Sequence, residues 1–334
     1  MLQQTQVKTV WPFWERWMRE LPTVAALAAA RPERVLKLWE GLGYYTRARN
    51  LQRAAQLIVA RPGGEFPTQF DEMLALPGVG RYTAGAIGSI AFNQPAPILD
   101  GNVMRVLTRL FALTGNPREK ETNARLWQLA EQLVRAAAAV DFKSQIPNSK
   151  FPLAGPCSAL NQALMELGAL VCTPRSPQCP RCPLAARCVA RRQGLAAQLP
   201  NLAPRAAKTA RRFLAFVAQH GDHFLVRQRP AGLINAHLWE FPGVEIEALA
   251  VNPVEQFCQQ FNITPRRWTP LGVIKHSITR YRMSVEAFHA ALPRRPAAPA
   301  GHWRTRGELD ALAFTSAHHK ILGKLPPPRT LPGA

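Results

Sequence analysis

Four cysteines in the middle of the chain constrain the fold of their region more than any other feature of the sequence. Their spacing is C-x6-C-x2-C-x5-C, formed by Cys172, Cys179, Cys182 and Cys188. Thiols so close in sequence cannot all pair as unstrained disulfides, but they can converge on one centre. Four thiolates suit either a tetrahedral zinc ion or a [4Fe-4S] cluster, and the spacing alone leaves both alternatives open.

The residues around these cysteines and the two other cysteines add to this picture. Arginines crowd the loop, where they would offset the charge of a thiolate-ligated centre or contact DNA phosphates: Arg175, Arg181, Arg187 and Arg191. Cys157 and Cys258 are isolated in the sequence and are expected to be buried as small apolar residues. Reduced thiols of this kind indicate a reducing compartment, so we expect the protein in the cytoplasm.

The composition indicates a polyanionic partner. The chain has 334 residues, enough for two domains, with a formal net charge of +21 and a pI near 10.9. A GC-rich genome would account for the abundance of arginine but not for the shortage of acidic residues. Lysine and arginine that neutralise phosphates give strong binding to nucleic acid. Because no apolar run could span a bilayer and no amphipathic basic helix stands out, we expect DNA and not a membrane as the partner. We also expect a monomer in the bacterial nucleoid.

Changes in sequence pattern divide the chain into parts. Apolar residues recur at helical spacing from Val7 to Leu21, as though a helix were already under way at Met1. Beyond Cys188, a polar stretch gives way to short runs rich in β-branched and aromatic residues, such as "RRFLAFVAQ" and "RYRMSVEAFHA". We expect a mainly α domain over 1–192, a linker over 193–211, an α+β domain over 212–325 and a disordered tail over 326–334.

A glycine-containing turn lies in the stretch "LPGVGRYTAGA", with Gly78 and Gly80 between two helical segments. Two glycines let the backbone adopt positive φ and approach a ligand closely. The free N–H groups of the second helix would form an anion site, and Arg81, which follows Gly80, is a further candidate contact. On a basic protein this anion would be a DNA phosphate, which positions the duplex without reading its sequence. The alternative is an ordinary turn between two helices.

A carboxylate follows in "PILDGNVMRVLTRL", where Asp100 stands between an apolar run and a helix. An aspartate in this place is commonly a helix cap. It can also be a partly buried, ionised carboxylate that faces a cleft from the helix N-terminus. The pattern by itself leaves both roles open.

Several motifs combine into a family resemblance. In this order, "MLQQTQV", "LWEGLGYYTRARNL", "LPGVGRYTAGAI", "ILDGNV", "NQALMELGA" and the cysteine loop closely resemble the MutY-type adenine DNA glycosylases, which belong to the helix-hairpin-helix superfamily with endonuclease III. The resemblance runs from Met1 to about Cys188, and a weaker one covers the second domain. It implies two helical lobes around a DNA-binding cleft, a [4Fe-4S] cluster in the loop 172–188, and a C-terminal α+β domain of the MutT-like (Nudix) type. The activity it implies is removal of adenine paired with 8-oxoguanine or guanine in double-stranded DNA.

The resemblance also assigns roles to individual residues. Asp100 matches the family's catalytic aspartate, which stabilises the oxocarbenium-like sugar as the base departs. Asn102 matches a residue that lines the same pocket. Other family residues probe or wedge the duplex while the target base is flipped out. The residues of this chain that match them are Gln3, Gln4 and Tyr44.

Tyr82 distinguishes between two activities of the superfamily. Endonuclease III-like enzymes carry a lysine at this point of the hairpin motif, and that lysine attacks the sugar carbon. A tyrosine cannot form the Schiff base that lyase chemistry requires. The resemblance therefore implies a monofunctional glycosylase that uses water as the nucleophile.

The second domain resembles the MutT-like fold at "QRPAGLINAHLWEFPGV" but lacks the carboxylates of an active Nudix enzyme. Nucleotide hydrolysis is not expected, because no carboxylate remains to hold Mg²⁺. An active box would have a glutamate at 249 and an R-E-U-x-E-E run from 257, and the chain has Leu249, Phe257, Cys258, Phe261 and Asn262 there. In the family this domain recognises 8-oxoguanine through a loop often reading F-S-H. Ile278, Thr279 and Arg280 align with that loop, and Thr279 is the candidate contact because it retains the hydroxyl.

One catalytic group of the family has no counterpart in this chain. A glutamate two residues before the Met-Leu-Gln-Gln motif acts as the general acid that protonates adenine N7, whereas this chain starts at Met1 of that motif. One hypothesis is that the sequence is N-terminally truncated and the glutamate lies upstream. The other is that the protein binds A:8-oxoguanine mispairs with impaired catalysis. A third possibility, a regulatory DNA-binding protein on this scaffold, would bind equally well without the Asp100 carboxylate.

Overall fold

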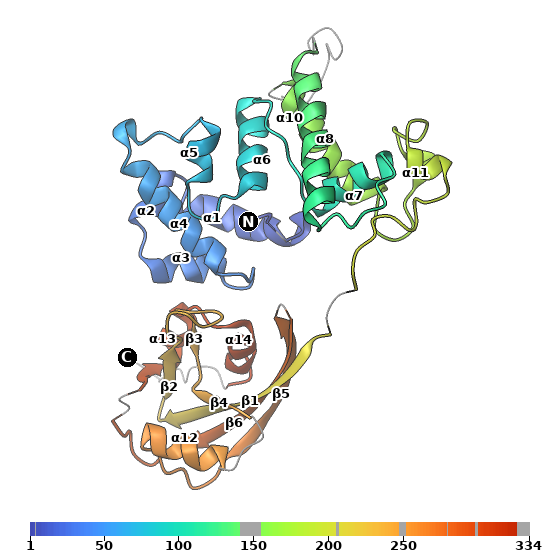
Figure 1. Ribbon diagram of the computed structural model, residues 1–334. Helices are drawn as coiled ribbons and strands as arrows, with labels where there is room; N and C mark the ends of the chain where they lie inside the picture. Colours follow the sequence, from blue (N-terminus) through green and yellow to red (C-terminus); the bar gives the residue numbers. More distant parts are fainter. Residues whose placement is uncertain are drawn as a thin grey trace. The chain divides into compact units, whose positions relative to one another are not determined.

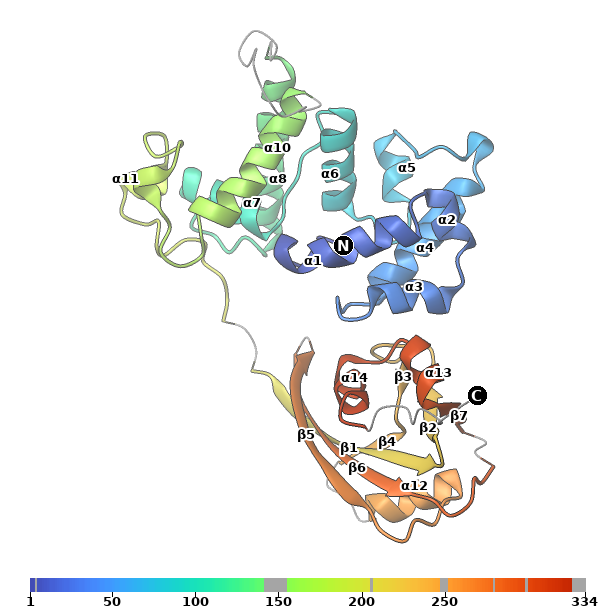
Figure 2. The same ribbon diagram turned by 180° about the vertical axis from the view of Figure 1, so that it is seen from behind.

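The computed structural model describes residues 1–3, 5–140, 155–204, 207–246, 252–278, 280–297 and 300–325. The predicted contacts Gln4 and Thr279 and the expected tail 326–334 lie outside these ranges. By internal contacts the chain divides into two compact units, one formed by Met1–Val59 with Ala206–Ala334 and the other by Ala60–Arg205. Figures 1 and 2 show helices in the first part of the chain and a sheet in the last. No helix in the described ranges is both long and apolar enough to cross a membrane.

The N-terminal helices of the first unit are α1 (Val7–Glu20), α2 (Val24–Ala29), α3 (Pro32–Trp39) and α4 (Thr46–Val59). The prediction of a helix already under way at Met1 is wrong. Helix α1 begins at Val7, after Gln6 in an extended conformation (φ −69°, ψ 147°). The carbonyl groups of Met1 and Gln3 accept hydrogen bonds from Arg47 on α4 instead of from helical N–H groups, so this segment is tied to a neighbouring helix.

The apolar stripe that the sequence shows on α1 packs against α3 and α4. Trp17 of α1 and Trp39 of α3 meet edge to face, with ring centroids 5.6 Å apart. The same core contains the buried residues Val10, Leu21, Leu27, Val35, Leu36, Leu42, Tyr45, Ala48 and Ala55. Since α1 has no side-chain N-cap and includes Pro12, packing against the other helices stabilises it more than local signals do.

The second unit is helical, and α7 lies at its centre. Its elements are the helices α5 (Phe70–Leu74), α6 (Arg81–Phe92), α7 (Gly101–Leu110), α8 (Lys120–Ala138), α10 (Pro156–Glu166) and α11 (Val189–Arg192), the 3-10 turns η1 (Pro62–Gly64) and η3 (Cys179–Arg181), and the π turn η2 (Leu167–Val171). Helix α7 contacts α8, α10, α11 and η2, and its Val103, Val106 and Leu107 are buried in their common core. Cys157 is buried at the start of α10 as predicted, whereas Cys258 is only partly buried.

The C-terminal part is a mixed sheet with helices on both faces (Figure 1). Its strands are β1 (Thr209–His220), β2 (His223–Gln228), β3 (Trp239–Glu240), β4 (Gly243–Glu245), β5 (Thr269–Ile278), β6 (Tyr281–Ala291) and β7 (His302–Thr305). The order is β3-β2-β1-β6-β5, with β4 paired to β1 and β7 to β2, and β1 and β6 run parallel. The strands predicted from "RRFLAFVAQ" and "RYRMSVEAFHA" are confirmed as β1 and β6.

Side chains of β1 alternate between the two faces of the sheet. Ala215 and Val217 belong to the core that α13 (Arg306–Ala311) and α14 (Ser316–Leu322) cover, whereas Phe216 lies in the core beneath α12 (Pro253–Phe261). The rings of Phe216 and Phe257 stack with centroids 4.2 Å apart, and Phe261 is buried beside them. Phe261 stands where an active Nudix box would have a glutamate, and both Phe261 and Phe257 serve packing in α12 instead.

A buried charge cluster links α14 to β2 and β3. Glu240 is 4% exposed and accepts hydrogen bonds from Arg227 (2.8 Å) and Arg229. The Nδ1 atom of His318 accepts a hydrogen bond from the backbone N–H of Phe241 (3.1 Å), which requires an imidazole without a proton on that nitrogen. Burial lowers the pKa of His318 to about 4, although Glu240 favours the charged form.

We expect the free energy of unfolding of the sheet domain to fall as the pH drops from 6.5 to about 4. In this window the unfolded chain protonates His318 and the native chain does not, so acid favours the unfolded state. The full shift corresponds to about 3 kcal/mol. The pH dependence should be weaker in His318→Asn, whose amide oxygen can still accept from Phe241, and denaturant titrations would measure it. A residual slope is expected from His276 and His289, because burial also lowers their pKa values. Equal slopes in both proteins would contradict the assignment.

Candidate active site and cysteine-lined cavity

Asp100 immediately precedes α7 and caps it. Its Oδ1 atom accepts hydrogen bonds from the backbone N–H groups of Asn102 (2.9 Å) and Val103 (2.8 Å). The side-chain amide of Asn102 reaches the Oδ2 atom at 3.4 Å. The half-buried carboxylate thus lies at the positive end of the α7 dipole, which favours its negative charge. The cap, one of the two roles that the sequence left open, is therefore present, and it uses mainly one of the two carboxylate oxygens.

Arg105, one turn further along α7, joins Asn102 to the segment that leads into the cysteine loop. Its Nη2 atom donates to Asn102 Oδ1 (2.9 Å) and to the Gly168 carbonyl (2.6 Å), and its Nε atom donates to the Cys172 carbonyl (2.7 Å). The residue is only 8% exposed. Because Arg105 occupies the amide oxygen of Asn102, the amide nitrogen is turned toward Asp100.

The close approach of the π turn to α7 requires a glycine. A Cβ atom on Gly168 would lie 2.7 Å from the Cβ of Asn102 and 3.0 Å from its backbone. No larger residue fits there without displacing the start of α7. The glycine of the motif "NQALMELGA" therefore supports the Asn102 side of the site, and π turns are frequent at functional sites.

Tyr82 lies in the first turn of α6 and shares the neighbourhood of Asp100. Its hydroxyl donates to the Met165 sulfur (3.2 Å). Burial, and after it the charge of Asp100, raises the pKa of Tyr82, so the phenol is neutral at physiological pH. The second unit thus brings Asp100, Asn102 and Tyr82 together, as the sequence motifs suggest.

The turn between α5 and α6 has part of the predicted backbone geometry. Gly78 has a φ of +80°, which favours glycine. Gly80 has an ordinary φ of −93°, but a Cβ there would meet nothing within 4 Å, so the start of α6 is open to close approach. Arg81 is exposed, with its guanidinium carbon 3.9 Å from the centre of the Trp127 ring.

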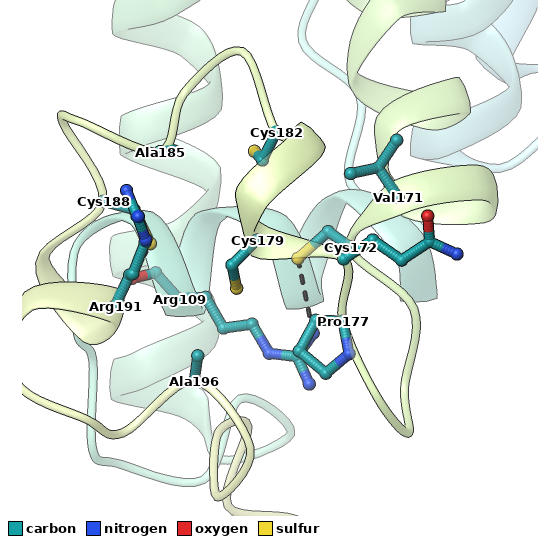
Figure 3. A pocket seen from close by; sticks show the side chains of 11 residues that line it. Arg109, Val171, Cys172, Pro177, Cys179, Cys182, Ala185, Cys188, Arg191 and Ala196 are labelled. Atoms are coloured by element: carbon teal, nitrogen blue, oxygen red, sulfur yellow. Dashed lines mark hydrogen bonds between the residues drawn. The ribbon is translucent and has the colours of Figure 1, made fainter.

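All four cysteines of the loop line one cavity (Figure 3). Within the described ranges no group of His, Cys, Asp or Glu side chains is arranged to hold a single metal ion. Burial, with the charges of the other three cysteines added to it, raises the pKa of Cys182. Four thiolates in this cavity therefore need a cationic group among them, and the donor set of four thiols with no carboxylate in the lining suits a soft metal centre.

Arg109 lies against the same cavity and is 2% exposed. Its Nη1 atom donates to the sulfur of Cys172 (3.3 Å, dashed in Figure 3) and to the Thr173 carbonyl (2.7 Å). A buried cation in this position offsets the charge of a thiolate. Arg191, which is exposed on α11, also lines the cavity. The other three arginines named above are exposed as well and are not among its lining residues: Arg175, Arg181 and Arg187.

Two of the residues predicted to contact DNA are described in the first unit. Tyr44 is 51% exposed, in the loop between α3 and α4, with a φ of +48°. Gln3 precedes α1, and its carbonyl accepts a hydrogen bond from Arg47. Gln4 and Thr279 fall outside the described residues.

Sequence reasoning missed the buried arginines of α7. Arg105 and Arg109 are four residues apart in "GNVMRVLTRL", so they lie on one side of the helix. The buried apolar residues Val106 and Leu107 lie between them in the sequence, and this was the available signal for burial. Sequence reasoning also missed the partly buried Arg47, which follows the glycine-rich loop of "LWEGLGYYTRARNL".

Comparison with known proteins confirms the predicted family. Residues 1–132 match the HhH-GPD superfamily of base excision DNA repair proteins, and residues 214–324 match the NUDIX domain family. The chain is 36% identical to adenine DNA glycosylase of Arabidopsis thaliana over 73% of this chain and 41% of that protein. With that of Buchnera aphidicola subsp. Schizaphis graminum the identity is 38%, over 57% of this chain and 50% of that protein. Adenine DNA glycosylase of Rattus norvegicus is 34% identical over 96% of this chain and 69% of the rat protein. Because identity at this level extends over both domains, the chain belongs to the adenine DNA glycosylases, which are DNA N-glycosylases of base excision repair.

Proposed function

We propose that this chain removes adenine paired with 8-oxoguanine or guanine in double-stranded DNA, by hydrolysing the N-glycosidic bond without cutting the strand. The observation that carries the proposal is the carboxylate of Asp100 next to a tyrosine, and not a lysine, at position 82. The names of the relatives favour an active glycosylase over the alternative of a mispair-binding protein with impaired catalysis.

The geometry at α7 suits stabilisation of a sugar cation. Positive charge develops on the deoxyribose as the base departs. Asp100 Oδ1 is fixed by two backbone N–H groups, which leaves Oδ2, with its long contact to Asn102, to face that charge. The charge exists only near the transition state, so a preorganised carboxylate stabilises the transition state more than the substrate. Water then replaces the base at the sugar carbon, because Tyr82 offers no amine.

We infer that the cysteine-lined cavity holds a [4Fe-4S] cluster on Cys172, Cys179, Cys182 and Cys188. Thiolates that share one zinc ion stand about 3.8 Å apart, since each lies about 2.3 Å from the metal in a tetrahedron. A cluster distributes its ligands over four irons. The four cysteines are spread around a cavity, and in the described ranges no set of side chains is arranged for a single metal ion. This arrangement fits a [4Fe-4S] cluster better than a zinc ion. The cluster would hold the loop against α7, and the hydrolysis itself does not pass through it.

Contacts to the duplex are proposed in both units. Gly78, Gly80 and Arg81 would bind a phosphate, because the first N–H groups of α6 have no side-chain cap and no Cβ in front of them. Residues 212–325 would read 8-oxoguanine at the turn between β5 and β6, where Thr279 is the proposed contact. Arg280 beside it is exposed and donates to the hydroxyl of Tyr281 (2.9 and 3.0 Å), so hydrogen-bonding groups are present at this turn.

Single-turnover release of adenine tests the proposal. Duplexes would carry adenine opposite 8-oxoguanine, guanine or thymine at one position. We expect release to be fastest opposite 8-oxoguanine, slower opposite guanine and undetectable opposite thymine. Borohydride should trap no covalent adduct with the DNA, since Tyr82 forms no Schiff base. Equal release from the three duplexes would refute the specificity, and a trapped adduct would refute the monofunctional mechanism.

A further inference from the structure

Arg47, in the first turn of α4, contacts two separate segments of the chain. On one side its Nη1 atom donates to the carbonyls of Met1 (2.9 Å) and Gln3 and to the hydroxyl of Thr5 (3.2 Å). These residues precede α1 and lie outside any helix or strand. Arg47 therefore donates to backbone carbonyls that would be bonded by backbone N–H groups in a helix or strand.

On its other side Arg47 holds the loop between α3 and α4. The Nη2 atom donates to the carbonyls of Leu42 (3.2 Å) and Gly43 (3.1 Å). The guanidinium carbon lies 5.2 Å from the ring centre of Trp39 and 5.6 Å from that of Tyr44. The Gly43 carbonyl also accepts from Trp39 Nε1 (3.0 Å). One guanidinium group thus links the loop to the segment before α1.

The loop holds Tyr44 in an unfavourable backbone conformation. Its φ of +48° lies in a region that residues other than glycine rarely adopt, and its side chain is 51% exposed. The flanking Gly41 and Gly43 also have positive φ, of +102° and +70°. Strain of this kind persists only where surrounding contacts enforce it. The hydrogen bonds from Arg47 to the carbonyls before Tyr44 are such contacts.

We propose that Arg47 is a positioning residue that sets the spacing between Gln3, whose neighbours Met1 and Thr5 it also contacts, and Tyr44, so that both engage the duplex together. This rests on the proposed function, in which Gln3 and Tyr44 contact the mispaired DNA. A side chain wedged between bases must resist restacking, and a loose loop would be pushed aside. Arg47 does not itself bind the DNA: both terminal nitrogens donate to protein carbonyls, and its Nε atom is buried.

The test is the affinity of the full chain for a duplex with 2′-fluoroadenosine, whose fluorine blocks hydrolysis, opposite 8-oxoguanine, compared with an A:T duplex. The preference is the ratio of the affinities for the mispair duplex and the A:T duplex. In Arg47→Gln we expect this ratio to be about tenfold smaller, because several charge-assisted hydrogen bonds are lost. Arg47→Lys keeps the charge but not the planar fork, and a similar loss is expected. Arg53→Gln, exposed on the same helix, is the matched control and should keep the preference.

Salt dependence separates positioning from direct phosphate binding. The slope of log affinity against log salt concentration is expected to be the same in wild type and in Arg47→Gln. A slope smaller by about 0.9 would mean that Arg47 neutralises a phosphate, and this would overturn the proposal. Wild-type preference in Arg47→Lys would overturn it too, because charge alone would then suffice. Circular dichroism and thermal unfolding establish that each variant is folded before its affinity is interpreted.

A double-mutant cycle tests whether Arg47 acts through Tyr44. Tyr44→Ala is expected to lose about tenfold of the preference, and the double variant with Arg47→Gln should lose little more, since both changes disable the same wedge. Independent losses that multiply to about a hundredfold would refute the coupling. A wild-type chain without preference for the mispair would refute the proposed function itself. Preserved preference in wild type and in both Arg47 variants would reject only the positioning role.

Discussion

Replacing Asp100 with asparagine is expected to lower the single-turnover rate of adenine release by about a thousandfold, with binding of the duplex little changed. Asparagine caps a helix as well as aspartate does, so its oxygen can still accept from the N–H groups of Asn102 and Val103. The backbone at the start of α7 is then preserved. What the variant lacks is the negative charge that would stabilise the sugar cation, and the loss therefore appears in the rate and not in the affinity.

Two further variants separate charge from structure. Asp100→Ala removes the cap as well as the charge, and should show the same loss of rate together with a loss of about 1 kcal/mol in the free energy of unfolding. Asp71→Asn removes an exposed carboxylate from the first turn of α5 in the same unit and should leave the rate unchanged. Asp100→Asn with a rate within about tenfold of wild type would reduce Asp100 to a structural cap.

Replacing Cys182 with alanine is expected to abolish stoichiometric iron binding and to destabilise the second unit by several kcal/mol. Residues 172–188 contain a short 3-10 turn and further turns but no strand or α-helix, so only short-range backbone hydrogen bonds hold this loop internally. Binding energy of a metal centre is folding energy for such a loop. Iron analysis, visible absorption and the midpoint of thermal unfolding would measure the effect on the purified chain.

The matched control is Cys258→Ala, which removes a partly buried thiol from the other unit and should leave the iron content unchanged. A colourless wild-type protein with one zinc ion per chain would show that the cavity holds zinc. Full iron content in Cys182→Ala would show that Cys182 is not a ligand. In either case the assignment of Asp100 is unaffected, because its test is independent of the metal.

Whether a contact in the site could be predicted depends on how far apart in the sequence its two residues lie. The cap formed by Asp100 and the positive φ of Gly78 depend on neighbours a few residues away, and both can be predicted from local pattern. The start of α1 cannot, because the carbonyls before it bind Arg47, which is 46 residues from Met1. Arg105 likewise finds an acceptor at Cys172, 67 residues along the chain, and no local pattern identifies that partner.

The sequence by itself determined the chemistry that this protein can perform: a carboxylate before a helix, a tyrosine in place of a lysine, and four thiols close enough to share one centre. It also determined the family, since these motifs occur in the family's order. Only the tertiary structure decided which arginines are buried with the site and which way Asn102 turns its amide. The physical reason is that a buried guanidinium must find acceptors for its donors wherever packing provides them, and packing brings together segments far apart in the chain.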